Sequence, residues 1–417
     1  MIVVSRSNRH LAQELRRCKS DVGDANFVDG AKEVTTAGYA KTVIFCTGGL
    51  GRVFEPSTNA LIVTGDGMAL AYNAGARLMD MEMVQYHPTT LAGSGVLISE
   101  AARGEGAYLL DKNGYRFLEK YAPSMMELAS RDVVSRAEQT EINAGNGING
   151  NVLLDCRHLG AALIKEKLSQ IREIGMDLGG VDLIEQPIPI RPGMHYIMGG
   201  IKTDVDGQTN VPGVYAAGEC ACVSVHGGNR LGANSLLDTI VFGERSGNHA
   251  AMASRGMEYI EFNVDEAVLR EERRIQEMLD RPKNGERIAG IRLAMGQSMN
   301  QNLAVFRTQA GIEETISDLQ ALKARYVKMP VDNQGRTFNT DLVFALELGY
   351  MLDCAETVAV SALDRKDSRG AQFRTDYPAR DDKSWLKHIV VTKGEVGPEI
   401  SYSPVSITKW APEERKY

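Results

Sequence analysis

The sequence predicts an α/β fold followed by a helical domain, and three observations support this prediction. Residues 41–46 form a short apolar run that ends in two glycines, which is typical of a buried strand. A second strand-like run over residues 213–217 gives way to Gly218 and Glu219. From about residue 255 glycine becomes rarer and apolar residues recur with a helical period. Glycine-rich strand ends followed by amphipathic helices favour an α/β body with a helical appendage.

Composition places limits on the class of protein. The chain has 417 residues, which is too long for one hydrophobic core and fits two or three domains. Its net charge of −7 speaks against nucleic acid as a partner, because nucleic acid favours a basic surface. Apolar residues at 43% and charged residues at 24% exclude disorder, collagen and disulfide scaffolds. We also expect no membrane span, no signal peptide and no metal site, since the six cysteines include no CxxC pair.

The expected elements of the first half are short. A helix is expected over residues 68–75, directly after an aspartate, and an amphipathic helix over residues 132–143. The only literal dinucleotide fingerprint is Gly145-x-Gly147-x-x-Gly150, which follows a polar helix and precedes a strand-like segment at residues 152–154. That order is the reverse of the strand–glycines–helix order that phosphate binding needs. We therefore interpret these glycines as a loop.

The second half is predicted to be helical. A first helix ends before Pro282, and a second has its apolar face over residues 312–322 and ends before Pro330. A third follows the plausible caps Asn339 and Thr340 and shows one apolar stripe over residues 342–363. A strand-like segment at residues 388–392 lies in the C-terminal tail.

Glu219 is a candidate ligand-binding residue, because it stands where a strand of an α/β sheet ends. A carboxylate there suits a vicinal diol such as a ribityl or ribose chain, and a surface-loop glutamate is the alternative. Fifteen residues later a helix begins, with Asn234 or Ser235 expected at its N-cap. Its free N–H groups and positive potential suit an anion. A flavin, which carries diols and develops negative charge, fits both features.

Other candidates are basic or imidazole groups in glycine-rich or apolar segments. His87 and His195 each stand alone, and single histidines are more often structural than catalytic. Arg230 follows two glycines, so the backbone can approach a ligand closely while the guanidinium grips a carboxylate with two hydrogen bonds. Residues 99–106 and 129–136 add alternating acids and bases, and their spacing alone would favour solvated surface charges.

Six separated motifs together resemble the flavoprotein subunits of succinate dehydrogenase and fumarate reductase, in that family's order and spacing over residues of about 40–417. The motifs are Gln85-Tyr-His-Pro-Thr89, Ser99-Glu-Ala-Ala-Arg-Gly-Glu-Gly106, Tyr121-Ala-Pro with Arg131-Asp-Val-Val134, His195-Tyr-Ile-Met-Gly-Gly200, Ala216-Ala-Gly-Glu219, and Ser224-Val-His-Gly-Gly-Asn-Arg-Leu-Gly-Ala-Asn-Ser-Leu-Leu-Asp238. The resemblance implies an α/β FAD-binding domain (Rossmann-like, incomplete) with an inserted α+β capping domain and a C-terminal helical domain. It assigns 1–84 and 194–254 to the FAD-binding domain, 85–193 to the capping domain, 255–365 to the helical domain and 366–417 to a C-terminal segment.

The resemblance also implies roles for residues at matching positions. The two carboxylates of a C4 dicarboxylate would be bound by His87, Ser99, His195 and Arg230, with Ser99 keeping the hydroxyl of the family's usual threonine. Arg131 would donate and accept the proton, and Glu100 and Arg103 would relay protons to solvent. FAD would contact Thr47, Gly48, Gly49, Asp66, Glu219, Asn234, Ser235 and Leu236.

The implied reaction is hydride transfer between succinate or fumarate and FAD. Electrons would pass to an iron–sulfur subunit and then to quinone at membrane anchor subunits. The chain would lie peripherally on the cytoplasmic side of the membrane, or on the matrix side of a mitochondrial membrane. The family's opening βαβ unit, with the Ser-His stretch that bonds covalently to flavin, is not found, so we expect a shortened member or fragment that holds FAD non-covalently. An L-aspartate oxidase-like flavoenzyme and a truncated, non-catalytic remnant are the alternatives.

Overall fold

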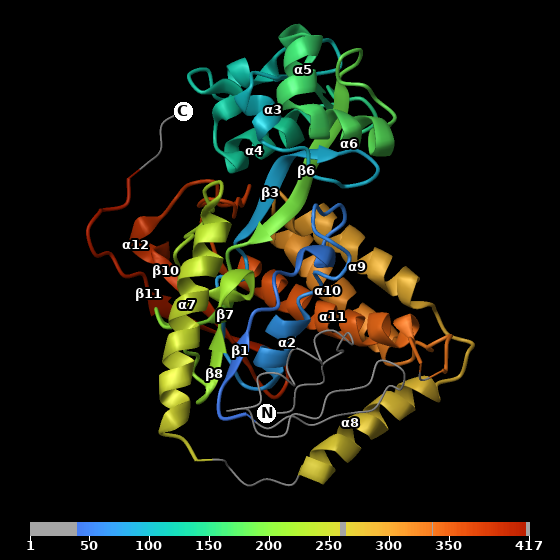
Figure 1. Cartoon of the computed structure of the whole chain (residues 1–417), viewed down its shortest axis with the longest axis vertical. Coiled ribbons are helices and arrows are strands. Elements are labelled where there is room, and N and C mark those ends of the chain that lie inside the picture. Colours follow the sequence, from blue (N-terminus) through green and yellow to red (C-terminus); the bar gives the residue numbers. More distant parts are fainter. Residues whose placement is uncertain (1–39, 259–263, 336, 414–417) are drawn as a thin grey trace.

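The computed structural model describes residues 40–258, 264–335 and 337–413. Figure 1 shows an upper body joined to a larger lower body by two long antiparallel strands, β3 (Val84–Leu91) and β6 (Ile188–Ile197). Each body buries its own cluster of apolar side chains. The predicted domain boundaries remain predictions, but the segment between β3 and β6 is a unit with a separate core.

In the lower body, the two predicted strands pair with each other. They are β1 (Val43–Phe45) and β8 (Val214–Ala216), which run parallel, with Val43 opposite Val214. The helix α2 (Asp66–Asn73) follows β1 and begins two residues earlier than predicted. Because β1 and β8 are parallel, the residues that follow them meet at one edge of the sheet. Glu219 lies after β8 in the short 3₁₀ turn η5 (Gly218–Cys220), opposite the glycines that follow β1.

A second sheet brings the C-terminal segment into the lower body. Its strand order is β11-β10-β2-β7-β9, with β11 (Pro398–Pro404), β10 (Lys387–Lys393), β2 (Leu78–Met79), β7 (Gly200–Lys202) and β9 (Ala221–Cys222). The strand expected at residues 388–392 is therefore confirmed as β10. Its pairing with β2 is a contact between segments about three hundred residues apart in sequence.

The upper body is a four-stranded sheet of order β3-β6-β5-β4 covered by short helices. Its further elements are β4 (Tyr108–Leu110), β5 (Val152–Asp155), α3 (Ala101–Gly104), α4 (Arg131–Asn143), α5 (Ala161–Lys167), α6 (Ser169–Gly179) and the 3₁₀ turns η2 (Phe117–Lys120), η3 (Met126–Leu128) and η4 (Arg157–Leu159). The predicted helix over residues 132–143 is confirmed as α4, which packs across β3. Gly145 and Gly150 have φ of 75° in the turn before β5, so the fingerprint-like glycines are a loop, as predicted.

Long helices complete the lower body. They are α7 (Asn234–Arg255), α8 (Val264–Leu279), α9 (Ile288–Leu303), α10 (Gln309–Tyr326) and α11 (Thr340–Asp364), together with the 3₁₀ turn η1 (Gly51–Val53) and the short α12 (Asp382–Trp385). The Asn339 side chain caps α11 by accepting from Leu342 N at 2.9 Å, whereas Thr340 is its first residue. The apolar stripe predicted on α11 packs inside the protein, and Ala345, Leu348 and Met351 outside that stripe are buried as well. Helices α2, α9 and α10 and strand β10 all pack against α11, so it is a central helix.

Candidate active site

Arg131 opens α4 and is held by two neighbours on other elements. Its Nη2 and Nε lie 2.8 and 3.2 Å from Oε2 of Glu100, and its Nη1 donates to Oε1 of Gln85 at 3.1 Å. A cation at the start of a helix is opposed by the helix dipole, which Asp132 in the same turn offsets. Arg131 therefore lies at the end of the helix where the dipole disfavours a cation. Its hydrogen bonds to Glu100 and Gln85 fix the orientation of its side chain.

Glu100 connects Arg131 to Arg103. One carboxylate oxygen pairs with Arg131, and the other lies 3.3 Å from Nη2 of Arg103. Partial burial raises the pKa of Glu100, but the hydrogen bond from Arg131 and the charge of Arg103 outweigh burial and leave the pKa below its ordinary value. The side chain of Glu100 is 46% exposed and that of Arg103 is fully buried. The three predicted relay residues are thus contiguous, and Glu100 is the member that meets solvent.

His87 and His195 face each other from adjacent strands. Their ring centroids are 5.0 Å apart, in an edge-to-face arrangement. Burial lowers the pKa of His87 well below its ordinary value, and it lowers that of His195 to about 3, with the charges of Arg131 and Arg230 adding to the shift. Both rings are therefore neutral at neutral pH. Because the Thr89 N–H donates to Nδ1 of His87 at 3.2 Å, the neutral His87 ring carries its proton on Nε2.

Arg230 lies in the loop between β9 and α7 and is 4% exposed. Its guanidinium stacks on the ring of Tyr196 at 4.3 Å, and Nη1 donates to the Leu231 carbonyl at 3.2 Å and to the Ser235 hydroxyl at 3.4 Å. Burial, followed by the charge of Arg131, lowers the pKa of Arg230. Its Nε is buried and has no hydrogen-bond partner among the described residues. A buried, incompletely paired guanidinium suits an anionic ligand.

The loop that carries Arg230 closes against Arg131. A Cβ atom at Gly232 would lie 3.7 Å from Oε2 of Glu100 and 3.8 Å from Nη2 of Arg131. The structure thus brings Arg131, Glu100, His87, His195 and Arg230 together. Ser99 is exposed beside Glu100, and its hydroxyl oxygen accepts from Ala101 N at 3.3 Å, which leaves the hydroxyl proton available to a ligand.

The predicted FAD-contacting residues at the strand ends also gather. A Cβ atom on Gly49 would lie 2.3 Å from Oε1 of Glu219, so a larger residue at this position would displace the Glu219 carboxylate. Burial raises the pKa of Glu219 to about 7, and its Oε1 accepts from Ile197 N at 3.1 Å. Gly48 has φ of 74°, and Thr47 before it packs against the first turn of α2.

Asp66 stands in that first turn of α2. Its Oδ1 accepts from the Gly67 N–H at 2.9 Å, and burial raises the pKa of its carboxyl. A Cβ atom on Gly67 would lie 2.0 Å from Oγ1 of Thr47, so the Thr47 side chain packs directly against the backbone of α2 at Gly67. Thr47, Gly48, Gly49, Asp66 and Glu219 therefore lie at the shared edge of β1 and β8.

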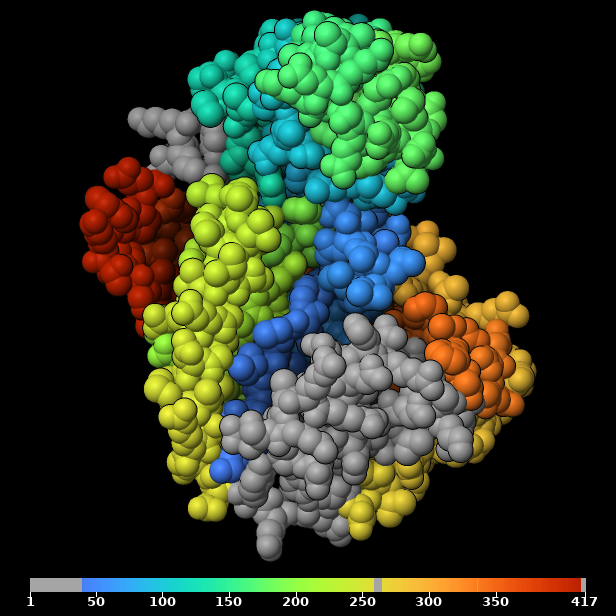
Figure 2. Space-filling view, viewed as in Figure 1, coloured from blue at the N-terminus to red at the C-terminus, as the bar shows by residue number. Residues whose placement is uncertain are grey.

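The N-terminus of α7 differs from the prediction. Asn234 is the first helical residue and neither Asn234 nor Ser235 caps the helix, because Ala233 takes the N-cap position with φ of 64° and the Ser235 hydroxyl accepts from Arg230. The first N–H groups of α7 are therefore not covered by a side-chain cap. Figure 2 shows α7 (yellow) along one face of the molecule, where Leu236 is 67% exposed. A helix N-terminus without a side-chain cap and an exposed apolar side chain beside it fit a flavin at this edge.

Three residues with a structural role in the site were not singled out in the sequence. Gln85 bonds to Arg131 and also donates to the Arg230 carbonyl oxygen at 2.7 Å. Thr58 holds Nδ1 of His195 at 2.8 Å, and Tyr196 supports Arg230. Gln85 could have been found, because it is two residues before His87 on one strand and such residues share a face. The sequence around Thr58 gave no indication of its role, because its partner His195 is 137 residues away in the chain.

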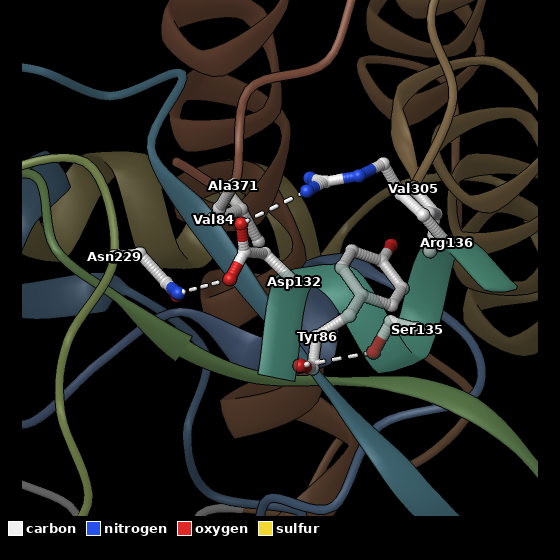
Figure 3. Close-up of a pocket in the computed structure, with 8 residues that line it drawn as sticks. All are labelled: Val84, Tyr86, Asp132, Ser135, Arg136, Asn229, Val305 and Ala371. Atoms are coloured by element: carbon white, nitrogen blue, oxygen red, sulfur yellow. Dashed lines mark hydrogen bonds and ion pairs between the residues drawn. The ribbon is translucent and has the colours of Figure 1, made fainter. Parts of the chain in front are cut away.

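A polar network at a small pocket behind α4 fixes the positions of Arg131 and Arg230 relative to each other. Figure 3 shows Asn229 donating to Asp132, at 2.7 Å, while Arg136 pairs with the same carboxylate at 3.0 Å. Asp132 follows Arg131 and Asn229 precedes Arg230. Gln85 also donates to Asn229 at 2.7 Å. The backbone at both arginines is thus tied to one polar network.

Comparison with known proteins agrees with this geometry. Residues 3–236 match the family described as FAD binding domain, and residues 292–417 match the family described as fumarate reductase flavoprotein C-term. A fumarate reductase flavoprotein subunit of Mycobacterium tuberculosis is 45% identical over 397 residues, which are 91% of this chain and 68% of the relative. A succinate dehydrogenase flavoprotein subunit of Coxiella burnetii is 41% identical over 385 residues, with 88% and 64% covered. An Escherichia coli quinol fumarate reductase structure superposes with a TM-score of 0.88 at 38% identity, covering 94% of this chain and 72% of that one.

The fold and the FAD-binding match define a flavin-dependent oxidoreductase. Within that class, the chain belongs to the family of fumarate reductase and succinate dehydrogenase flavoprotein subunits. The predicted family and fold class are confirmed, and the aspartate oxidase-like and non-catalytic alternatives are not favoured. The chain spans about two thirds of the length of the curated relatives that it matches. Across the described residues, no helix has the length and apolar character needed to cross a membrane.

Proposed function

We propose that this chain interconverts succinate and fumarate with FAD as its redox cofactor. The observation that carries the proposal is the convergence of Arg131 and Arg230 with two neutral histidines, close to the FAD-binding edge. The buried guanidinium of Arg230 and the partly exposed one of Arg131 give the site a positive potential that suits a small dianion. Neutral imidazoles add hydrogen-bond donors without adding further positive charge.

The substrate would be held at both carboxylates. The free Nε of Arg230 and the Nε2–H of His87 are donors for these groups, and His195 and the hydroxyl of Ser99 are the further ligands that we propose. Bidentate, desolvated contacts fix the C4 chain and polarise it, so positioning provides much of the acceleration. Gln85 and Tyr196 keep the two arginines in place.

When bound, FAD supplies or accepts the hydride at one carbon of the substrate. We assign the proton at the adjacent carbon to Arg131. A guanidinium is a weak acid, so it suits a strongly basic developing carbanion, and a neighbouring group must then pass a proton back to it. Glu100 is that group, because it pairs with Arg131 at 2.8 Å and is exposed to solvent, from which its carboxylate can take up the proton that it passes on, and Arg103 pairs with its second oxygen.

FAD would be held by Thr47, Gly48, Gly49, Asp66, Glu219, Asn234, Ser235 and Leu236, and we propose that this chain holds it non-covalently. The described histidines outside the substrate site have partners within the protein. His158 bonds to the Gly106 carbonyl, His226 to Tyr196, His249 to Tyr215 and His388 to Asp80. Each of these histidines has one ring nitrogen engaged by the protein, and none of them follows a serine as in the family's covalent attachment stretch.

We further propose an iron–sulfur subunit as the electron partner and membrane anchor subunits as the attachment to the membrane, on its cytoplasmic or mitochondrial matrix side. The relatives are named as flavoprotein subunits, and one solved relative is a quinol fumarate reductase with menaquinol.

The test is turnover by the FAD-loaded protein. Fumarate reduction with a reduced dye as electron donor should be observed, together with dye reduction by succinate. L-Aspartate in place of succinate is the matched comparison. Turnover with aspartate but not succinate would assign the site to aspartate oxidation, and a loaded protein inactive with both would refute the proposal.

A further inference from the structure

Three side chains of the five-stranded sheet and its loops form a hydrogen-bonded chain outside the active site described above. His388 of β10 lies between Asp80, which follows β2, and Ser224, which comes two residues after β9. Nδ1 of His388 is 2.6 Å from Oδ2 of Asp80, and its Nε2 is 3.3 Å from the hydroxyl oxygen of Ser224. Ser224 opens one of the sequence motifs, and the proposed function gives neither Ser224 nor His388 a role.

The Asp80 carboxylate determines which nitrogen of His388 carries the proton. A carboxylate only accepts hydrogen bonds, so the proton of the neutral ring lies on Nδ1 and points to Asp80. Nε2 then carries the lone pair and accepts from the Ser224 hydroxyl. Asp80 is itself held in place, because its Oδ1 accepts from the Ile389 N–H at 3.2 Å and its own N–H donates to the Ile389 carbonyl at 2.9 Å. A serine that donates to an imidazole oriented by a carboxylate is the arrangement of an activated nucleophile.

The backbone at this cluster is strained. Ser224 has φ of 74° and Asp80 has φ of 54°, in the left-handed region that residues with a side chain disfavour. Strained residues of this kind cluster at functional sites. The path of the chain from a strand into a turn at Ser224 is similar to a nucleophile elbow, although the flanking glycines of that motif are absent.

Donors for a developing negative charge follow the serine directly. The N–H groups of Val225 and His226 make no backbone hydrogen bond within the part of the chain that the structure describes. In serine hydrolases, the N–H group after the nucleophile stabilises the oxyanion of the tetrahedral intermediate. The position after Ser224 therefore supplies a donor of the required kind.

We propose that Asp80, His388 and Ser224 form a second catalytic site, which hydrolyses esters of short, uncharged acyl groups. The hydroxyl oxygen of Ser224 attacks the ester carbonyl carbon while its proton moves to Nε2 of His388. The bond to the alcohol oxygen then breaks, and His388 gives the proton to that oxygen. Water attacks the acyl carbon in turn, one of its protons returns through His388 to the Ser224 oxygen, and the acid leaves. Ester and water give acid and alcohol, no electrons are transferred, and all three residues end in their starting states.

The exposure of the cluster fits this reaction. The side chains of His388 and Asp80 are 12% and 9% exposed, so the base and its carboxylate are shielded from water, while Ser224 is only half-buried. Val225 beside the serine is 57% exposed and offers an apolar contact to a small acyl group. The Asp80 carboxylate disfavours an acyl group with a negative charge. The substrate class is therefore different from the dicarboxylates of the first site.

The neighbouring strand provides a matched control. Ser403 of β11 stands directly opposite His388 in the sheet, and it is half-buried as Ser224 is. Its hydroxyl is directed to the sulfur of Met79 at 4.0 Å rather than to the imidazole. Ser403→Ala therefore removes a serine close to the same histidine without touching the proposed nucleophile.

The first experiment is covalent labelling of the whole chain with a fluorophosphonate probe, followed by peptide mass spectrometry. An activated serine reacts with this probe, whereas an ordinary hydroxyl does not. We expect the label on Ser224, with at least a tenfold slower reaction in His388→Gln and Asp80→Asn and no change in Ser403→Ala. An unlabelled Ser224, or equal labelling in His388→Gln, would overturn the inference.

The second experiment measures hydrolysis of p-nitrophenyl acetate by the same proteins, with melting temperatures as a check on folding. Ser224→Ala and His388→Gln should lower the rate by about 10² or more, and Ser403→Ala should keep the wild-type rate. If Ser224→Ala does not fold, Ser224→Gly also removes the hydroxyl, and glycine adopts φ of 74° without strain. A wild-type rate in a folded Ser224 variant would show that other surface groups hydrolyse the ester and that the inference is wrong.

Fumarate reduction separates this inference from the proposed function. The FAD-loaded Ser224→Ala variant should reduce fumarate within a few-fold of the wild-type rate, because Ser224 is not among the proposed ligands of the substrate or of FAD. Loss of fumarate reduction in this variant, without loss of folding, would place Ser224 in the first site and contradict a separate second one.

Discussion

Replacing Arg131 with glutamine tests the assignment of the proton donor. The substitution removes the guanidinium but keeps a polar side chain at the start of α4. In the structure, Arg131 donates to Glu100 twice and to Gln85 once. The proposed substrate ligands Arg230, His87 and His195 are left in place. We therefore expect a loss of turnover with little loss of substrate binding.

The expected sizes of the two effects are different enough to separate. A missing general acid lowers kcat by roughly 10²–10⁴. The Glu100 side chain that pairs with Arg131 is 46% exposed, so solvent screens this ion pair. Loss of the ion pair should therefore lower the free energy of unfolding by only about 1 kcal/mol. Arg230→Gln should instead weaken dicarboxylate binding by about 2–5 kcal/mol, because a desolvated carboxylate loses its buried partner. Arg131→Gln should therefore change mainly kcat, and Arg230→Gln should change mainly the dissociation constant of the dicarboxylate.

The assay combines dye-coupled fumarate reduction, dissociation constants from flavin spectral shifts and melting temperatures on the same preparations. Arg157→Gln is the control, because Arg157 lies in the same upper body and pairs with Asp155 at 2.8 Å, outside the substrate site and outside the polar network around Arg131 and Arg230. Its turnover should stay within a few-fold of wild type. If Arg131→Gln keeps wild-type turnover, or loses it only in proportion to unfolding, Arg131 is a structural ion-pair residue and the assignment is wrong.

Further predictions concern the cofactor and the stability of the site. Gly49→Ala should abolish FAD binding, measured by flavin absorbance after dialysis, because its Cβ would lie 2.3 Å from Oε1 of Glu219. Acid precipitation should release all flavin into the supernatant, and flavin fluorescence on the denatured band of a gel would show a covalent bond instead. The pKa of His195 is lowered to about 3 from 6.5, so the unfolded chain binds more protons in that range and the free energy of unfolding should fall as pH drops below 6.5. His195→Gln should flatten this dependence in urea melts at several pH values, and an unchanged slope would contradict the burial argument. Asn229→Ala removes the 2.7 Å hydrogen bond to buried Asp132 and should cost about 1–3 kcal/mol in urea unfolding, together with a higher KM.

The sequence predicted elements best where a local period and a clear end signal coincide. The helix of residues 132–143, the cap at Asn339 and the strand at residues 388–392 all lie where they were expected. Each depends on interactions within a few residues, and a window of sequence contains all the information that they need. The start of α7 was wrong, because the left-handed Ala233 and the bond between Ser235 and Arg230 are set by the surrounding loop rather than by the preferences of Asn234 or Ser235.

The candidate site was predicted from motifs, and its geometry was decided by the fold. By themselves, spacing and residue type favoured structural roles for His87 and His195 and a solvated surface charge for Arg131. The structure shows the reason, since Arg131 meets Glu100 across 31 positions and Gln85 meets Asn229 across 144. Contacts between residues so far apart in the sequence depend on the pairing of β3 with β6 and on the loop between β9 and α7.

The sequence by itself therefore determined which residue types this protein carries at its strand ends and helix starts, and through its motifs the family to which the chain belongs. Only the tertiary structure decided that Glu100 is exposed while Arg103 is buried, that α11 is surrounded on several sides, and that Glu138 is enclosed without a hydrogen-bond partner. The physical reason is that burial and charge pairing are properties of the packed assembly. The position of an acidic residue in the helical period is the same whether its side chain faces water or the protein interior. Its pKa differs between these two environments, and only the tertiary structure shows which one applies.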